Sequence, residues 1–155
     1  RGGYTIAGGV AQPQLILMAT GSEVELMLKA HSALEAQGVR VRSVSLPCLE
    51  LFARQPPDYV EGVLPGACRA RVAIEAATKG VWGSLVGLDG EHVGAPTFGA
   101  AGPTKRLARE IRLTVEEVVA AAGRVLGRQP RTMSAEAAIS SEWKKRRTRS
   151  RSQDL

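Results

Sequence analysis

Polar residues follow two predicted strands of this sequence, at places where a small anion or ligand can bind. Thr20, Gly21 and Ser22 join an apolar run to the start of a helix, and Glu75 lies at the end of another apolar run. Free backbone N–H groups at a helix start favour an anion. A carboxylate at the carboxyl end of a buried strand is well placed to contact a ligand. These four residues therefore make a weak candidate site for an anion or ligand.

The same residues also have a structural interpretation, and we expect that one to hold. Close approach of a phosphate usually needs several glycines, and only Gly21 is present. Glu23 and Glu25 bring negative charge into the first helical turn, where it suits the helix dipole and repels an anion. Ser22 and Glu25 fit the S-x-x-E pattern of a capping box, which satisfies two backbone donors without a ligand. For Glu75 a hydrogen-bonded structural role is expected.

Side chains that carry catalysis or hold metal ions are scarce. The two histidines, His31 and His92, are far apart, and neither has a Cys or a second His at ligand spacing. We expect His31 to be packed on the apolar face of a helix, while His92 lies in a glycine-rich region. Cys48 and Cys68 form no CxxC pattern and predict two reduced thiols in a cytosolic protein. We therefore assign no catalytic, cofactor-binding or metal-ligating residue.

The elements that position these residues follow from the hydrophobic pattern. Gln14–Ala19 is an almost continuous apolar run, typical of a strand buried on both faces. A helix begins at Ser22, has its apolar residues at helical spacing and ends at Gly38. Val39–Leu46 alternates apolar with polar residues and predicts a second strand. Strand, helix and strand in close succession predict a βαβ unit with a right-handed crossover in a parallel sheet.

The remaining elements continue this alternation. The apolar face of the first helix is predicted to hold Val24, Met27, Leu28, His31 and Leu34. Further predicted elements are short helices at Leu49–Ala53 and Asp58–Leu64, strands at Arg71–Ala76 and Glu91–Gly94, and helices at Pro103–Glu110 and from Thr114 to Leu126. Thr114 and Glu117 form a second capping box. The pattern predicts an α/β fold with a mostly parallel β-sheet flanked by helices.

Composition divides the chain into a folded part and a basic tail. The 155 residues have 44% apolar content, enough for one core, and a formal net charge of +6. Residues 131–155 carry seven Lys or Arg against three Asp or Glu. We expect one domain over residues 1–128 and a basic, disordered tail over residues 129–155. Trp143 and the run KKRRTRSRS make this tail the one candidate for nucleic-acid binding, although basic runs are usually only solvated.

Neither a membrane span nor a signal peptide is predicted. No apolar run approaches the roughly 20 residues that a membrane helix needs, and the start of the chain lacks an apolar stretch with a cleavage pattern. We therefore expect a cytoplasmic protein with no membrane partner. The sequence opens with Arg1 rather than Met, which suggests a piece of a longer protein.

Several short motifs occur in a specific order along the chain. They are GGYTI, LILMATGSEVEL, VRVRSVSLPCLELF, VLPG and RVAIEA, then Trp82, VGLDG, FGAAGP and LTVEEVV. From about Gly2 to Leu126 this ordered set resembles the C-terminal (third) domain of transketolases. The sequence departs from the family at Ala101 and Gly102, where Ser-Ala is usual, and in the tail, which has no counterpart. The resemblance implies a Rossmann-like three-layer α/β domain.

The resemblance also implies what the chain lacks. Complete transketolases transfer two-carbon ketol units between sugar phosphates, in the pentose phosphate pathway or the Calvin cycle. They are homodimers that use thiamine diphosphate and a divalent cation, Mg or Ca, held by the preceding pyrimidine- and diphosphate-binding domains. Gly87-Leu88-Asp89-Gly90 only superficially resembles the start of the cation motif Gly-Asp-Gly…Asn, and the chain contains no Asn. No catalytic residue carries over, so we expect a structural role in assembly, with no activity and no bound cofactor in the isolated chain.

A free-standing regulatory module is the alternative. It would bind a small anion or ligand at the carboxyl ends of its strands, near Thr20–Glu23 and Glu75–Lys79. The fragment hypothesis predicts an exposed apolar surface where the other domains would pack. The module hypothesis predicts measurable anion binding.

Overall fold

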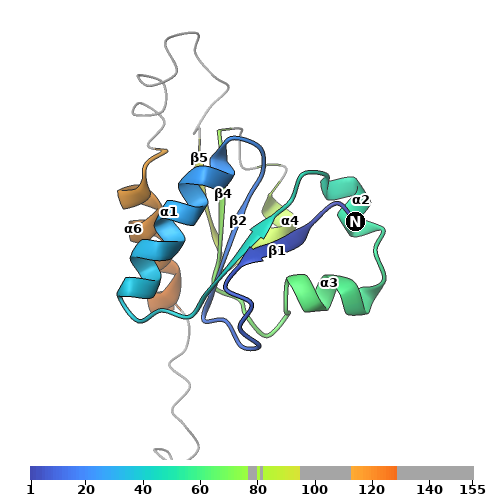
Figure 1. Cartoon of the computed structure of the whole chain (residues 1–155), viewed down its shortest axis with the longest axis horizontal. Coiled ribbons are helices and arrows are strands. Elements are labelled where there is room, and N and C mark those ends of the chain that lie inside the picture. The colour runs from blue at the N-terminus through green and yellow to red at the C-terminus, as the bar shows by residue number, and fades with distance from the viewer. Residues whose placement is uncertain (77–79, 81, 95–112, 129–155) are drawn as a thin grey trace, which may run out of the picture.

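The structure is a computed structural model that describes residues 1–76, 80, 82–94 and 113–128 (Figure 1). Its strands are β1 (Tyr4–Ala7), β2 (Leu15–Ala19), β3 (Val41–Ser45), β4 (Arg71–Glu75) and β5 (Glu91–Gly94). Its helices are α1 (Glu23–Ala36), α2 (Leu49–Ala53), α3 (Pro57–Val63), α4 (Gly83–Val86) and α6 (Val115–Arg128). The strands form one sheet in the order β1-β3-β2-β4-β5. Four of them run parallel, and β1 pairs antiparallel with β3 at one edge.

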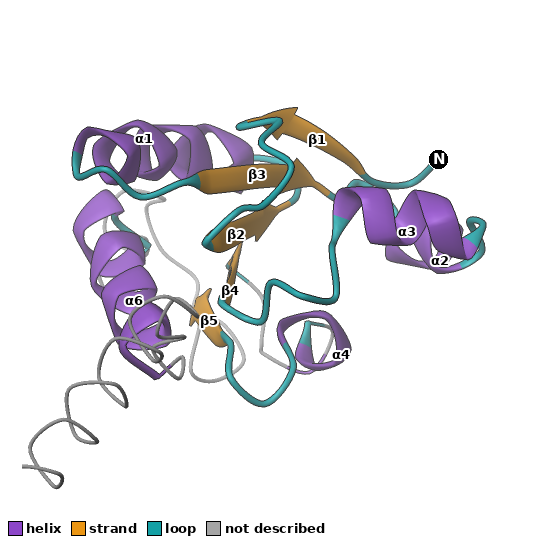
Figure 2. Ribbon diagram, turned by 90° about the horizontal axis from the view of Figure 1, so that it is seen from below, coloured by secondary structure: helices purple, strands orange, loops and turns teal. Residues whose placement is uncertain are grey.

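Helices cover both faces of the sheet, and each face has its own apolar core. In Figure 2, α1 and α6 lie on one face, and α2, α3 and α4 lie on the other. All five residues of the central strand β2 are completely buried. Leu15, Leu17 and Ala19 contribute to the core under α1 and α6, whereas Ile16 and Met18 contribute to the core under the other helices. The domain is therefore the expected three-layer α/β fold, and a continuous apolar run marks its central strand.

α6, the last helix among the described residues, completes one of the two cores. α6 contributes four completely buried side chains, which are Val118, Ala121, Ala122 and Val125. On its outer side the Arg124 guanidinium donates to the Glu91 carboxylate of β5 at 3.0 Å and to the Glu117 carboxylate at 2.8 Å. These hydrogen bonds raise the pKa of Arg124. Because the bonds join α6 to β5, they hold the final helix on the sheet.

Most predicted elements are confirmed, with differences at their ends. Met27, His31 and Leu34 of α1 are buried as expected, while Leu28 is half-buried and Ala30 also enters the core. β3 is shorter than predicted, and its polar residues are buried along with its apolar ones. The predicted helix over residues 103–110 and the predicted tail over residues 129–155 lie outside the described residues. The boundary at residue 128 coincides with the end of α6 and stays a prediction.

The capping box predicted at the start of α1 is wrong. Ser22 already has helical backbone angles and makes no capping hydrogen bond, and its hydroxyl instead donates to the Glu23 carboxylate at 3.1 Å. Glu25, which would complete the box, accepts a 2.6 Å bond from Lys29 one turn later. A capping serine must be extended, so that its hydroxyl faces the free N–H groups. The turn through Gly21 leaves Ser22 in the wrong conformation for this role.

At the start of α6 half of the predicted box is confirmed. The Thr114 hydroxyl accepts a hydrogen bond from the Glu117 N–H at 3.3 Å. The Glu117 side chain does not return the contact, because it binds Arg124.

Replacement of the first polar residue by alanine should therefore destabilise the protein at the start of α6 but not at the start of α1. Thr114→Ala should lower the free energy of unfolding by about 1 kcal/mol, since it removes a capping acceptor. Ser22→Ala should change it by less than about 0.5 kcal/mol, because no cap is lost. Urea unfolding of both variants, followed by circular dichroism, measures the difference. Equal losses would contradict the assignment of the caps.

Candidate functional site at the carboxyl edge of the sheet

The structure brings the four candidate site residues together. β2 and β4 are parallel neighbours, with Ala19 opposite Ile74, so Thr20 and Glu75 are the next residues along the two strands. The chain leaves β2 for α1 on one face of the sheet, while α4, which follows β4, lies on the other face (Figure 2). Adjacent parallel strands whose connections leave on opposite faces define a topological switch point, where open α/β sheets bind ligands. Thr20, Gly21, Ser22 and Glu75 occupy that position.

The local chemistry of this position does not suit an anion. The Thr20 and Gly21 carbonyls accept bonds from the Glu23 and Val24 N–H groups, at 3.3 and 3.4 Å, so these two donors are already used. The Glu23 carboxylate lies beside the Ser22 hydroxyl. Negative charge in this first turn repels a phosphate and stabilises the helix by itself.

The two other carboxylates near this edge are also engaged. Hydrogen bonding and charge attraction from Lys29 hold the pKa of Glu25 below its usual value, so this carboxylate stays ionised. Glu75 is half-buried and is engaged in an interaction within the chain. The switch point therefore has the position of a ligand site without a set of groups that would hold an anion.

Sequence reasoning missed the structural role of two arginines near the amino edge of the sheet, the buried Arg42 and the half-buried Arg71. Arg42 on β3 is 7% exposed, and its guanidinium donates to the carbonyls of Val10 at 2.6 Å, Gly62 at 2.8 Å and Val63 at 3.2 Å. It thereby joins β3 to the chain after β1 and to the end of α3. In the sequence, Arg42 lies between apolar residues of an alternating strand, a pattern typical of a side chain that faces solvent. The local pattern does not show that the end of α3 covers this side chain.

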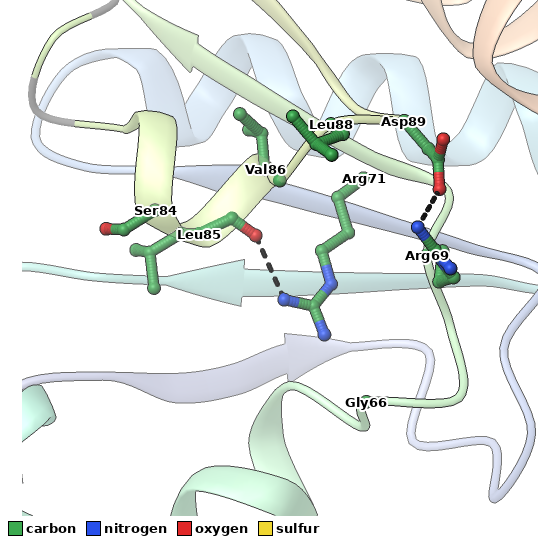
Figure 3. Close-up of a pocket in the computed structure, with 9 residues that line it drawn as sticks. Gly66, Arg69, Arg71, Ser84, Leu85, Val86, Leu88 and Asp89 are labelled. Carbon is green, nitrogen blue, oxygen red and sulfur yellow. Dashed lines mark hydrogen bonds and ion pairs between the residues drawn. The ribbon is translucent and has the colours of Figure 1, made fainter.

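Arg71, the first residue of β4, acts in the same way beside a pocket of about 160 Å³ (Figure 3). Its guanidinium donates to four backbone carbonyls at 2.9 to 3.2 Å, those of Cys68, Leu85, Leu64 and Pro65. Burial lowers the pKa of Arg71. Since its donors bind the protein itself, we interpret Arg71 as a structural tie between β4, α4 and the loop after α3.

Among the described residues, those around Gly87–Gly90 do not form a cation site. Asp89, the acidic residue of the Gly-Leu-Asp-Gly sequence, forms an ion pair with Arg69 at 2.6 Å across the mouth of the pocket (Figure 3). In the part of the chain that the structure describes, no three His, Cys, Asp or Glu residues are grouped so as to hold a metal ion. We therefore derive no catalytic step through a cofactor on this chain.

The two histidines occupy structural positions. His31 is buried on α1, with its Nδ1 atom 2.9 Å from the Ser43 hydroxyl and its Nε2 atom 3.3 Å from the Glu35 carboxylate. The expectation of a packed histidine is therefore confirmed. His92 lies within β5 and is paired with Ala73, so it belongs to the sheet rather than to a loop.

The two cysteines are free thiols that should differ in reactivity. Burial raises the pKa of the Cys68 thiol, although the nearby Arg71 charge opposes this, while Cys48 is half-buried at the start of α2. A neutral, buried thiol is a poor nucleophile. Ellman's reagent should therefore modify one thiol rapidly in the native protein and the second only in denaturant. Cys48→Ser should abolish the rapid phase, and two equally rapid thiols would contradict the assignment.

Comparison with known proteins agrees with this fold. The fold is that of an α/β domain with a mostly parallel sheet between two layers of helices. The sequence model of the "Transketolase-like TK C-terminal domain" family matches residues 2–114. The chain therefore belongs to the transketolase family, as its C-terminal domain.

Individual relatives give the same result. The chain is 47% identical over 126 residues to transketolase 1 of Escherichia coli, covering 81% of this chain and 19% of the relative. A transketolase structure from Leishmania mexicana superposes with a TM-score of 0.75 at 37% identity, covering 86% of this chain and 19% of the other. A Pichia stipitis transketolase in complex with sedoheptulose-7-phosphate superposes with a TM-score of 0.71 at 30% identity, covering 81% and 18%.

The chain spans about a fifth of the length of these relatives. Separately, none of the helices in the described residues is long and apolar enough to cross a membrane.

Proposed function

We propose that this chain acts as the C-terminal domain of an enzyme that transfers two-carbon ketol units between sugar phosphates. The preceding pyrimidine- and diphosphate-binding domains of a cytoplasmic homodimer would hold thiamine diphosphate and the divalent cation. Residues 1–128 would form the domain, and residues 129–155 a basic tail. The observation that carries the proposal is the family match over residues 2–114, in a chain that spans a fifth of its relatives. The sugar phosphate bound to the Pichia stipitis relative supports the substrate class.

The role of this chain in that enzyme is assembly. In the described part of the chain, Glu25, Asp89 and His31 are engaged in ion pairs or hydrogen bonds, and the side chains of Arg42 and Arg71 bind backbone carbonyls. These contacts stabilise a rigid three-layer body whose surface can pack on other domains. The isolated chain would transfer no ketol units.

Supplying the missing region in trans tests this role. E. coli transketolase is truncated before the region that matches this chain, and the full 155-residue chain is added. The positive control is the E. coli enzyme's own C-terminal region, added in the same way. It shows whether the truncated enzyme can bind a C-terminal region that is supplied as a separate chain. We expect this chain to form a complex with the truncated enzyme, measured by sedimentation velocity, and to raise its ketol transfer. Ketol transfer by the chain alone, or no complex where the E. coli region forms one, would overturn the proposal.

The alternative function, a regulatory module with an anion site, is favoured by one observation, the placement of Thr20 and Glu75 at the switch point. Titration with inorganic phosphate, followed by NMR of the Thr20, Gly21 and Ser22 amides, separates the two functions. The surrounding carboxylates lead us to expect no saturable shift at millimolar phosphate. Saturable shifts confined to these amides would favour the module instead.

A further inference from the structure

Three exposed apolar side chains lie on the two elements next to Gly2, which are the edge strand β1 and the helix α2. Of the four large apolar residues that are exposed in the described part of the chain, Tyr4 and Ile6 lie on β1 and Leu51 lies on α2, with exposed fractions of 48%, 42% and 46%. We call these three residues the N-terminal apolar surface. The fourth, Leu88, lies in the turn after α4.

Close packing fixes the start of the chain at this surface. A Cβ atom on Gly2 would meet the backbone of Cys48, Leu51 and Phe52, so only glycine lets the chain pass so close to α2. The Gly2 carbonyl accepts a bond from the Cys48 N–H at 3.1 Å, and the Gly3 carbonyl accepts one from the Tyr59 hydroxyl at 2.7 Å. β1 begins one residue later, beside α2 (Figure 1). The chain therefore meets the domain at a defined place.

The edge strand lacks the charges that usually protect an exposed sheet edge. β1 pairs with β3 alone among the described strands, and residues 2–22 contain no Asp, Glu, Lys or Arg. Tyr4 lies opposite Ser45, a residue on the α1 side of β3, whereas Leu51 lies on α2, on the other side of the sheet. The N-terminal apolar surface therefore includes both sides of this sheet edge. Natural edge strands are normally shielded by charged residues, and exposed apolar surfaces without them mark contacts with other parts of an assembly.

We propose that the N-terminal apolar surface is where the preceding part of a transketolase packs against this domain. The inference rests on the proposed function, because it takes its occupant from the relatives. About four fifths of the E. coli relative lies outside the matched region, and the family match is to a C-terminal domain. The polypeptide that precedes this domain therefore reaches it at Gly2, which lies against the backbone of α2 and leads into β1.

The contact is made by side chains rather than by addition of a strand. β1 has only four residues, and its pairing with β3 shifts by one residue between Thr5 and Ala7. A short, bulged edge is poorly suited to pair with another strand. Tyr4 and Ile6, which alternate with half-buried Thr5 and Ala7, present their side chains to a partner instead. Aromatic and aliphatic side chains of this kind form the buried centres of interfaces.

The test is the trans assembly described above, with substitutions in the full chain. Tyr4→Thr, Ile6→Thr and Leu51→Thr are combined, because threonine preserves strand propensity on β1 while removing apolar surface. Leu88→Thr is the matched control, since it removes a leucine that is 97% exposed elsewhere. We expect the triple variant to bind the truncated E. coli enzyme more than tenfold more weakly, and the Leu88 variant to bind as the unchanged chain does. The thermal unfolding midpoint of each chain shows that its fold is retained.

The outcomes separate this inference from the function on which it rests. If the unchanged chain fails to bind where the E. coli region binds, the proposed function fails. If the unchanged chain binds and the triple variant binds equally well, or if Leu88→Thr causes the same loss, this inference alone fails. As a second readout, the same substitutions are made in a fusion protein. In this fusion the truncated E. coli enzyme is followed directly by the full 155-residue chain. There the triple variant should lose ketol transfer through weakened assembly, and unchanged transfer would overturn the inference.

Discussion

Replacing Arg42 by methionine should destabilise this domain by about 3–5 kcal/mol, a large share of the 5–15 kcal/mol typical of a whole domain. The Arg42 guanidinium is buried and donates to the carbonyls of Val10, Gly62 and Val63. Methionine fills similar space but donates no hydrogen bonds, so three carbonyls lose their partner, and the bond to the Val63 carbonyl is buried. Chemical unfolding in urea, followed by circular dichroism, measures the loss.

Arg40→Met is the matched control for this prediction. Arg40 lies two residues earlier and is exposed, and its side chain makes one bond of 3.2 Å to the Gln12 carbonyl. Its replacement should cost less than about 1 kcal/mol. Arg42→Lys should fall between the two, because an ammonium group keeps the charge but cannot reach three carbonyls at once. If the two methionine variants are equally stable, Arg42 is not a structural tie.

Gly8→Ala should be almost as damaging, with an expected loss of about 3 kcal/mol or more. Gly8 has a φ of 66°, which favours glycine, and a Cβ atom there would collide with the Val41 carbonyl oxygen of β3. It would also lie 2.8 Å from the Cε1 atom of the buried His31 ring. Backbone on one side and a packed ring on the other leave no room to adjust. The denaturant midpoint and the urea dependence of unfolding measure the loss.

The neighbouring glycine provides the control. A Cβ atom on Gly9 would meet nothing within 4 Å, so Gly9→Ala should leave stability within about 0.5 kcal/mol of the unchanged chain. The pair separates the effect of close packing from the general effect of adding a methyl group to a glycine turn. A large loss at Gly9, or none at Gly8, would show that the turn after β1 is not packed as the structure has it.

The sequence predicted those parts of the fold that depend on local pattern. The apolar run of β2, the spaced apolar residues of α1 and the run that becomes β4 each bury a face whose period is visible in the sequence. The capping box at Ser22 failed because a capping serine needs an extended backbone, which its residue type does not reveal. The burial of Arg42 was missed because it depends on Val10, Gly62 and Val63, which are distant in the sequence.

The candidate site was predicted only in part, because the sequence shows local pattern but not which strands are neighbours. Each of Thr20 and Glu75 could be placed at the end of a strand from local pattern. That they are neighbours depends on the order of the strands, which puts β4 beside β2 although β3 comes between them in the chain. The bond between Glu25 and Lys29 was not predicted, because Glu25 was assigned to the capping box, although the two residues have the i, i+4 spacing of a helical ion pair.

The position of α6 affects how the protein can be produced. The family match ends at residue 114, immediately before a helix that supplies four completely buried side chains to the core. A polypeptide ended at residue 114 would lack α6, one of the two described helices that cover the α1 side of the sheet, and should aggregate. The same gap exists briefly during translation, until α6 has left the ribosome. Because α6 is synthesised after the sheet and α1, the growing chain exposes the apolar residues that α6 later covers. Chaperones can recognise such exposed apolar residues.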